Sequence, residues 1–305
     1  MARTGGKELA WDNRASEAGV AFVDPLFVPG AQAAVRRHPR FRQTAEAISR
    51  TAIALHEGLD PSARWMLKDV GRTAVYVAIV ILDSLPFGVT PGQLAKICLA
   101  NGACSRARAL AFVSHGLATR HLVLSPGPQS WTKRRLIPQP AFRDILRGIL
   151  AGLMESGLAI APELSDAIPL LADDRHFAVS AAALGQIATQ AARLGISPIP
   201  AIEFFAERDG GLRMLQYLAG RQEPLRARLL DTAQMFKTDV ARRCGVSRIH
   251  LDTVLADAAQ VGLLSMPTPD RVVFAPALDE AFGRWVILQI QSLRYLARAM
   301  RAAAT

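Results

Sequence analysis

Apolar residues recur at helical spacing along most of the chain, and glycine or proline marks the breaks between the periodic segments. The pattern predicts helices over residues 41–57, 62–85, 140–156, 174–194, 201–221 and 277–301. Alternating segments at 119–124 and 132–137, joined by Ser125-Pro126-Gly127-Pro128, predict a β-hairpin, and a shorter hairpin is expected at 264–274. We therefore expect a mainly α protein with small β-hairpins, preceded by an N-terminal arm at residues 1–40.

One unit of this pattern occurs twice. Residues Leu94 to Asn101 lie over Val240 to Ser247, an offset of 146 residues, and the match continues ungapped to Gly116-Leu117 over Gly262-Leu263. Each copy reads as a helix, a turn, a second helix, a glycine that ends it, and a hairpin. The offset falls to 136 between Pro140 and Pro276, so the second hairpin is predicted to be ten residues shorter.

The repeat divides the chain into the arm, a first domain at 41–160 and a second at 161–305, related by a pseudo-twofold axis. Helices beginning near Ser62, Ala201 and Ala277 are expected to form the interface between them. Gly210-Gly211 is read as a helix break, and Thr90-Pro91 as a helix start.

Helical spacing separates inward from outward positions in the second helix of each copy. In the second copy the inward stripe is Leu251, Val254, Leu255 and Ala258, which leaves outward Ser247, Arg248, His250, Asp252 and Thr253. The matching outward positions of the first copy are Asn101, Gly102, Cys104, Arg106 and Ala107. Arg106 stays outward even if gaps place Ser105-Arg106 on Ser247-Arg248, whereas the position of Arg108 depends on the alignment.

The formal net charge is +10, and most of the basic residues are arginine, whose planar fork suits phosphate and guanine. A GC-rich genome would also favour arginine over lysine, but the placement of the charges decides between the two readings. Residues 84–143 hold no carboxylate in sixty positions and eight basic residues, namely Lys96, Arg106, Arg108, Arg120, Lys133, Arg134, Arg135 and Arg143. This indicates a phosphate-facing surface. Residues 237–282 instead combine five basic with six acidic residues, so we expect unequal DNA contacts from the two copies.

Other classes of protein find little support. Cys98, Cys104 and Cys244 form no disulfide framework or metal motif, which favours a reduced, cytoplasmic location near the nucleoid. The start of the chain is polar, and the apolar run at 74–82 is too short to span a bilayer, so no membrane contact is expected. No GxGxxG, Walker loop, HExxH or nucleophile elbow occurs, so we expect no enzyme activity, cofactor or metal.

The two copies resemble the MarR-type winged helix-turn-helix. In the first copy the resemblance rests on Leu94-Ala95, the turn, Gly116-Leu117 and the basic hairpin; in the second it rests on Val240-Ala241, Gly245-Val246-Ser247, Gly262-Leu263 and Pro269-Asp270-Arg271. The resemblance implies a second helix in the major groove and a wing whose arginine enters the minor groove. Asp270-Arg271 matches that wing in part, whereas Lys133-Arg134-Arg135 lacks the aspartate. Members of the family are usually homodimers of a shorter chain, so this fused tandem predicts a monomeric pseudo-dimer in preference to a homodimer.

The leading hypothesis is a sequence-specific bacterial transcription regulator that binds an imperfect inverted repeat in double-stranded DNA. Candidate DNA-binding residues are Asn101, Ser105, Arg106, Arg108, Arg120, Lys133, Arg134, Arg135, Ser247, Arg248, His250, Thr253 and Arg271. Arg106, Arg248, His250 and Thr253 are expected near bases, and the hairpin cations and Arg120 near phosphates or the minor groove. A replication initiator and a protein-binding winged-helix scaffold are the alternatives. A small-molecule effector could bind beside aromatic residues that also suit an ordinary core, namely Trp65, Tyr76, Phe204, Phe205, Tyr217 and Trp285.

Overall fold

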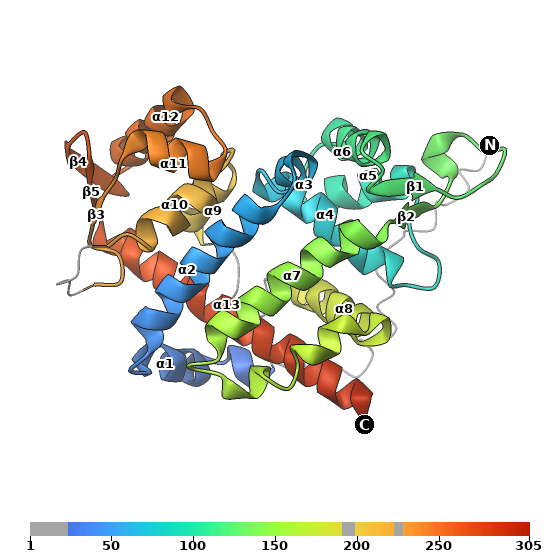
Figure 1. The fold of residues 1–305 in the computed structure, drawn as a ribbon, viewed down its shortest axis with the longest axis horizontal. Coiled ribbons are helices and arrows are strands. Elements are labelled where there is room, and N and C mark those ends of the chain that lie inside the picture. The colour runs from blue at the N-terminus through green and yellow to red at the C-terminus, as the bar shows by residue number, and fades with distance from the viewer. Residues whose placement is uncertain (1–23, 191–198, 223–227) are drawn as a thin grey trace, which may run out of the picture.

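The computed structural model describes residues 24–190, 199–222 and 228–305, which form a mainly α protein with two small antiparallel sheets (Figure 1). The first half contains η2 Pro25–Phe27, α1 Pro29–Arg37, α2 Phe41–Gly58, α3 Pro61–Met66, α4 Val70–Asp83, α5 Pro91–Ala100, α6 Arg106–Ala118, β1 Leu122–Leu124, η3 Trp131–Lys133, β2 Leu136–Pro138 and α7 Pro140–Gly157. The second half contains η4 Pro162–Leu164, η5 Pro169–Ala172, α8 Asp174–Gln190, α9 Pro200–Ala206, α10 Gly211–Ala219, β3 Thr232–Gln234, α11 Lys237–Cys244, α12 Arg248–Gln260, β4 Leu264–Thr268, β5 Arg271–Phe274 and α13 Pro276–Ala304.

The two halves contain the same series of elements. α5, α6, the β1–β2 hairpin and α7 recur as α11, α12, the β4–β5 hairpin and α13. At the predicted offset of 146, the buried residues of α5 match those of α11, since Leu94, Ala95 and Cys98 lie over Val240, Ala241 and Cys244. At an offset of 136, the five buried residues of α7 (Phe142, Leu146, Leu150, Met154 and Gly157) lie over buried residues of α13, Leu278, Phe282, Val286, Ile290 and Leu293.

The ungapped register predicted for the second helices is wrong. α6 and α12 follow the capping residues Ser105 and Ser247, an offset of 142. At this offset the buried residues of the two helices coincide: Ala109, Phe112, Val113 and Gly116 lie over Leu251, Val254, Leu255 and Ala258. The inward stripe predicted for α12 is therefore confirmed. The first copy has four extra residues between its helices, and its hairpin is longer by six residues, not ten, from Leu122–Leu136 against Leu264–Val272.

Gly116 does not end the second helix of the first copy, because α6 continues to Ala118. A Cβ atom at Gly116 would lie 2.7 Å from Leu122 Cδ1, so the glycine allows α6 to pack closely on β1. The chain leaves α6 at Arg120, whose φ of 60° matches the φ of 74° at Gly262 after α12. The predicted strand at 119–124 is accordingly shorter, because residues 119–121 complete the helix end.

Two predicted helices are each divided in two. Helix 62–85 becomes α3 and α4, and Asp69 starts α4 by accepting a hydrogen bond from Arg72 N (2.9 Å). Helix 201–221 becomes α9 and α10, and the break predicted at Gly210-Gly211 is confirmed by a φ of 67° at Gly210. Residues 191–194 of the predicted helix 174–194 lie outside the described residues.

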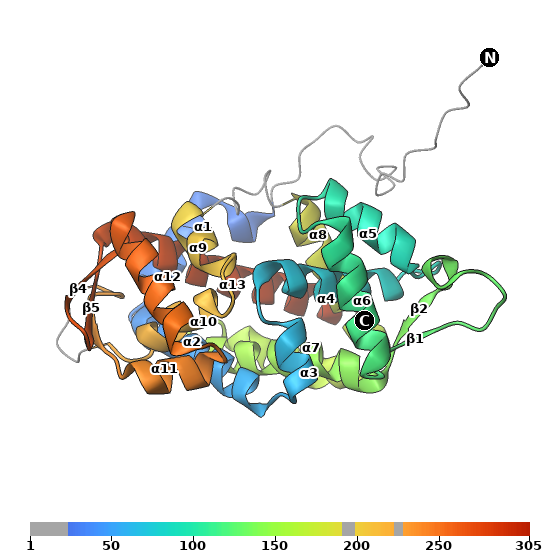
Figure 2. The ribbon, with the colours of Figure 1, turned by 90° about the horizontal axis from the view of Figure 1, so that it is seen from above.

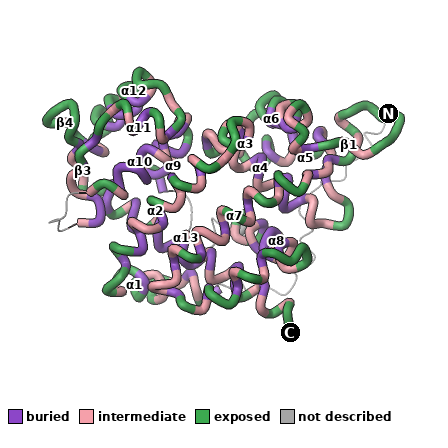
Figure 3. Tube along the Cα trace, viewed as in Figure 1, coloured by how far each residue is buried: buried purple, intermediate pink, exposed green. Residues whose placement is uncertain are grey.

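Two long helices, α2 and α8, each pack on helices of both halves and so join the halves at the centre of the molecule. α2 packs on α7 of its own half and on α10 of the other, while α8 packs on α13 of its own half and on α4 of the other. The predicted interface was therefore incomplete: it included α4, α10 and α13 but not the crossing helices α2 and α8. Figure 3 shows the buried residues gathered along α10, α13 and the inner sides of these helices.

The described part of the predicted N-terminal arm is packed against the body. η2 and α1 contact α13, Phe27 and Val35 are buried, and Asp24 pairs with Arg298. Residues 24–40 therefore lie along the body, as a strap would. Residues 1–23 lie outside the described residues.

Each hairpin has a third segment beside it. Val89, just before α5, forms a bridge with Leu136 of β2, and β3, just before α11, pairs with β5. The sequence analysis did not predict β3, because three residues are too few to show an alternating pattern.

Candidate nucleic-acid interface

The two repeated units, each a pair of helices followed by a hairpin (α5–α6 with β1–β2, and α11–α12 with β4–β5), lie at opposite ends of the long axis of the molecule (Figure 1). α6 and α12 are on the same face, and Figure 2 looks onto that face with the two hairpins at its outer ends. A single flat partner could therefore contact both second helices and both hairpins at once.

Local capping fixes the start of each second helix. Ser105 Oγ accepts a hydrogen bond from Arg108 N (3.2 Å), and Ser247 Oγ accepts one from His250 N (3.1 Å). α5 begins with the predicted cap, in which Thr90 Oγ1 accepts from Gln93 N and Gln93 Oε1 accepts from Thr90 N. The serine hydroxyls are thus engaged with their own helices.

The first residue of each second helix is an arginine. Arg106 and Arg248 are exposed, and neither has a hydrogen-bond or ion-pair partner among the described residues. Asn101 is exposed at the end of α5, and Thr253 is exposed on α12. Thr253 Oγ1 donates to Ile249 O (2.9 Å), so its methyl group is left to face outward.

The third residue of each second helix turns toward the body instead. Arg108 Nη2 lies 3.5 Å from Asp69 Oδ2, and His250 Nε2 lies 2.9 Å from the carbonyl oxygen of Asp209. The outward orientation predicted for His250 is therefore wrong, because the half-buried ring is held by the corner before α10. Arg108, whose position depended on the alignment, is likewise tied to the corner before α4.

The basic surface of the first unit is smaller than its sequence suggests. Arg135 and Arg143 pair with Asp83 at 3.4 and 2.8 Å, and Asp83 lies just outside the stretch that lacks carboxylates. Arg134 Nε donates to Ser125 O (2.6 Å) and so braces the hairpin. Lys96, Arg106, Arg120 and Lys133 are exposed and have no such partner among the described residues.

The second unit pairs its charges internally and exposes apolar side chains. Lys237 Nζ lies 2.6 Å from Asp252 Oδ1, and Arg242 Nη2 lies 2.6 Å from Asp239 Oδ1. Arg271 is exposed on β5, opposite Thr268 and Gln234. Large apolar residues are exposed at the ends of the helices, namely Phe236 (66%), Ile249 (80%) and Val261 (59%).

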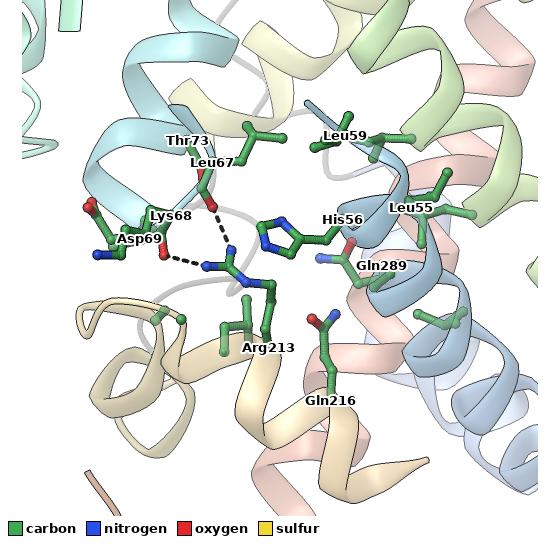
Figure 4. Close-up of a pocket in the computed structure, with 18 of the residues that line it drawn as sticks. Leu55, His56, Leu59, Leu67, Lys68, Asp69, Thr73, Arg213, Gln216 and Gln289 are labelled. Atoms are coloured by element: carbon green, nitrogen blue, oxygen red, sulfur yellow. Dashed lines mark hydrogen bonds between the residues drawn. The ribbon is translucent and has the colours of Figure 1, made fainter. Parts of the chain in front are cut away.

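A cavity of about 310 Å³ lies where the two halves meet, lined mainly by α2, α4, α10 and the corners before α4 and α10 (Figure 4). Aliphatic residues make up about half of its lining, and the polar residues are His56, Lys68, Asp69, Thr73, Arg208, Arg213, Gln216 and Gln289. Burial, with Arg213 and Arg64 nearby, lowers the pKa of His56 to about 3, so the imidazole is neutral. Of the six aromatic residues proposed to line an effector site, only Trp285 does so.

Arg213 joins the halves beside this cavity. Its guanidinium donates to the carbonyl oxygens of Leu67 (2.7 Å) and Lys68 (3.1 Å) in the first half, as Figure 4 shows. Lys68 Nζ also pairs with Asp209 Oδ2 at 2.6 Å, and Arg243 Nη1 with Glu57 Oε1 at 3.1 Å. None of these contacts was predicted from the sequence, because an arginine outside any recognisable motif gives no indication of which distant residues it will contact.

The described residues contain no group of three or more His, Cys, Asp or Glu side chains placed to hold a metal ion. Burial raises the pKa of the Cys98 and Cys244 thiols to about 12, and both residues lie on the buried face of the first helix of their unit. Within the described residues, no helix is both long enough and apolar enough to cross a membrane.

Comparison with family models gives no match for this chain, and comparisons with curated proteins and with solved structures give none either.

Proposed function

We propose that the protein binds double-stranded DNA through two winged helix-turn-helix units and acts as a transcription regulator. The observation that carries the proposal is the equivalence of Arg106 and Arg248. Both are the first residue of a second helix, both are exposed on one face, and both lack a partner among the described residues. Arginine in that position can donate two hydrogen bonds to guanine in the major groove.

The arrangement of the two units supports one duplex as the partner. A helix-turn-helix pair reads two half-sites about one helical turn apart, and such a pair is usually built from two chains. Here the crossing helices α2 and α8 fix the two units within one chain. We therefore propose a monomeric pseudo-dimer on an imperfect inverted repeat, with each unit of the MarR type that its sequence resembles.

The hairpins would contact the flanking backbone. Lys133 ends η3 in the loop that joins β1 to β2, and Arg120 lies just before β1; both are exposed. Arg271 occupies the corresponding strand of the second hairpin. These cations are proposed to bind phosphate or the minor groove, which fixes the register of the protein without reading sequence.

The test is binding of the full chain to duplexes selected from a random library, measured by fluorescence anisotropy. Arg106→Ala and Arg248→Ala should each weaken binding to the selected duplex by roughly 5- to 150-fold. Arg175→Ala is the matched control, since Arg175 is exposed on α8, away from the proposed face. Unchanged affinity in both variants, or no selected duplex, would refute the proposal.

The second candidate is a protein-binding scaffold, which the exposed Phe236, Ile249 and Val261 of the second unit favour. This candidate predicts that Phe236→Ser abolishes a complex with a protein partner, while the arginine variants keep it. The two candidates therefore differ in which variants fail.

A small-molecule effector is a further part of the proposal, and the cavity at the junction of the halves is its place. A molecule bound there would touch both halves and so change the spacing of the reading helices. Any compound that raises the Tm of the protein by binding there should lose that effect in Ala52→Phe, which fills the cavity. A Tm shift that persists in this variant would place the compound elsewhere.

A further inference from the structure

The outward faces of α6 and α12 differ at one position in a way that bears on the DNA sequence each could read. At the offset of 142, Arg106 corresponds to Arg248, and the next residue is Ala107 in α6 but Ile249 in α12. Ile249 is 80% exposed, although isoleucine is a residue that proteins usually bury. The rest of the α6 face is small, with Ala111 and Ser114 exposed behind Arg106.

The surroundings of Ile249 leave it available to a partner. Thr253 stands one turn further along α12, and its hydroxyl is occupied by the Ile249 carbonyl, so its methyl group extends the apolar spot. Asp252, the carboxylate on this face, is paired with Lys237 at 2.6 Å. The spot therefore consists of methyl groups beside an arginine that has no partner among the described residues.

Resting on the proposed DNA-binding function, we propose that the two units read different half-sites: both require a guanine, and only the α12 half-site requires a thymine, whose C5-methyl group contacts Ile249. Thymine is the one base that presents a methyl group in the major groove, and apolar side chains contact it there. Adjacent Arg248 and Ile249 would read adjacent positions, guanine and thymine. Ala107 is too short to make the same contact from α6.

The first experiment is selection of duplexes from a randomised library by the full chain, followed by sequencing. The expected motif has a guanine in both halves and a thymine in one half only. Two half-sites of equal information, each with the thymine, would overturn the inference while leaving the proposed function intact. Failure to enrich any duplex would overturn both, since no half-site would exist.

The second experiment isolates the methyl group. Replacing that thymine by deoxyuridine keeps the base pair and removes the methyl, and this should weaken wild-type binding about fourfold. Ile249→Ala should bind the two duplexes equally, and because Ile249 is exposed, the substitution leaves the core untouched. If Ile249→Ala keeps the fourfold preference, the methyl group is read by another residue and the inference is wrong.

The reciprocal change provides a gain of function. Ala107→Ile in α6 should create a preference of similar size for thymine over deoxyuridine at the matching position of the other half-site. The exposed side of α6 has room for the larger side chain. A duplex preference that is unchanged in both Ala107→Ile and Ile249→Ala would show that neither position reads the methyl group and would reject the inference.

Discussion

The first and second repeated units, each a helix pair with a hairpin, share a backbone plan but differ in how their charges are paired. In the first, Lys96, Arg106, Arg120 and Lys133 project without a partner among the described residues. In the second, Lys237 and Arg242 are matched by Asp252 and Asp239 within the unit, and Arg248 is the exposed cation without a partner among the described residues. Both units expose apolar side chains, such as Leu99 (59%) in the first and Ile249 (80%) in the second, so the units differ in unpaired charge and not in apolar exposure as such. For a DNA-binding protein, the first unit would supply most of the affinity and the second more of the selectivity.

The largest expected effect is on the free energy of unfolding, and it compares a contact between the two halves with a contact inside one half. Arg213 and Arg72 are both the third residue of their helices, α10 and α4, but Arg213 donates to two carbonyl oxygens of the other half. Arg72 instead makes contacts within its own half: it stacks on Trp65 at 4.3 Å, and its Nη1 lies 3.4 Å from Asp69 Oδ2, a carboxylate that also keeps Arg108 at 3.5 Å. Arg213→Ala should lower the free energy of unfolding by about 3 kcal/mol, since the carbonyl oxygen of Leu67 loses its donor and that of Lys68 keeps only the amide of Gly210 at 2.9 Å. Arg72→Ala should lower it by about 1 kcal/mol. Urea denaturation measures both free energies of unfolding. Equal losses would show that the contacts of Arg213 between the halves stabilise the protein no more than the contacts of Arg72 within one half.

The next effect is a pH dependence that arises at His56, which lies on α2 beside the turn of the second unit. The neutral form of His56 is favoured in the fold, because burial, Arg213 and Arg64 lower its pKa from 6.5 to about 3. The unfolded chain therefore binds a proton below about pH 6.5 that the folded chain does not, and stability falls as the pH drops from 6.5 toward 3, by up to about 1.4 kcal/mol per pH unit.

The matched variants are His56→Gln and His115→Gln, since burial also lowers the pKa of half-buried His115 in the first unit. Between pH 5 and 7.5, the dependence of the urea unfolding midpoint on pH should be reduced more by His56→Gln than by His115→Gln. His56 lies against Gly245 in the turn of the second unit, so hydrogen exchange at low pH should rise there first. A greater flattening in His115→Gln would reverse this assignment.

A smaller effect compares the ends of the second helices. Arg120 and Gly262 both have a left-handed backbone, with φ of 60° and 74°, which glycine adopts without the steric cost that arginine bears. Arg120→Gly should therefore raise the free energy of unfolding by about 1 kcal/mol. If the arginine binds phosphate, the same variant should also weaken DNA binding. Arg120→Asn, which tolerates this backbone but has no charge, should weaken DNA binding equally, and a variant that gains stability with full affinity would remove Arg120 from the interface.

The smallest effect separates unpaired from paired hairpin cations. Lys133→Ala should reduce the salt dependence of DNA affinity by about one phosphate contact. Arg135→Ala should reduce it less, because Arg135 already pairs with Asp83 at 3.4 Å. Affinities measured across a series of salt concentrations give both slopes. Equal slopes in the two variants would mean that Arg135 leaves Asp83 when DNA binds.

Several features of the fold followed from the sequence because they depend on neighbouring residues. The helices at 41–57 and 140–156 and the inward stripe of Leu251, Val254, Leu255 and Ala258 were predicted from apolar spacing alone, and the structure has them. The breaks within 62–85 and 201–221 differ in this respect. Gly210 marks its break in the sequence, whereas the break at Asp69 has no glycine or proline and was missed.

The alignment of the two copies shows why sequence matching gave the wrong register for the second helices. Gly116-Leu117 and Gly262-Leu263 are identical pairs, so an ungapped match was favoured, yet Gly116 packs on Leu122 inside α6 and Gly262 ends α12. Identity of letters does not reveal that one glycine is required for packing and the other for its backbone angle. The structural equivalent of Gly262 is an arginine, Arg120, which no residue comparison would select.

By itself the sequence determined the helical class, the repeated order of two helices and a hairpin, and the unequal charge of the two copies, since these reside in local periodicity and composition. Only the tertiary structure decided which cations are unpaired, because Asp83 reaches Arg135 and Arg143 across 52 and 60 positions of the chain. The same holds for His250, which Asp209 turns inward, and for Arg213, whose acceptors lie in the other half. Contacts between distant segments form when helices pack, and the spacing of residues along a chain does not encode which distant partners will meet.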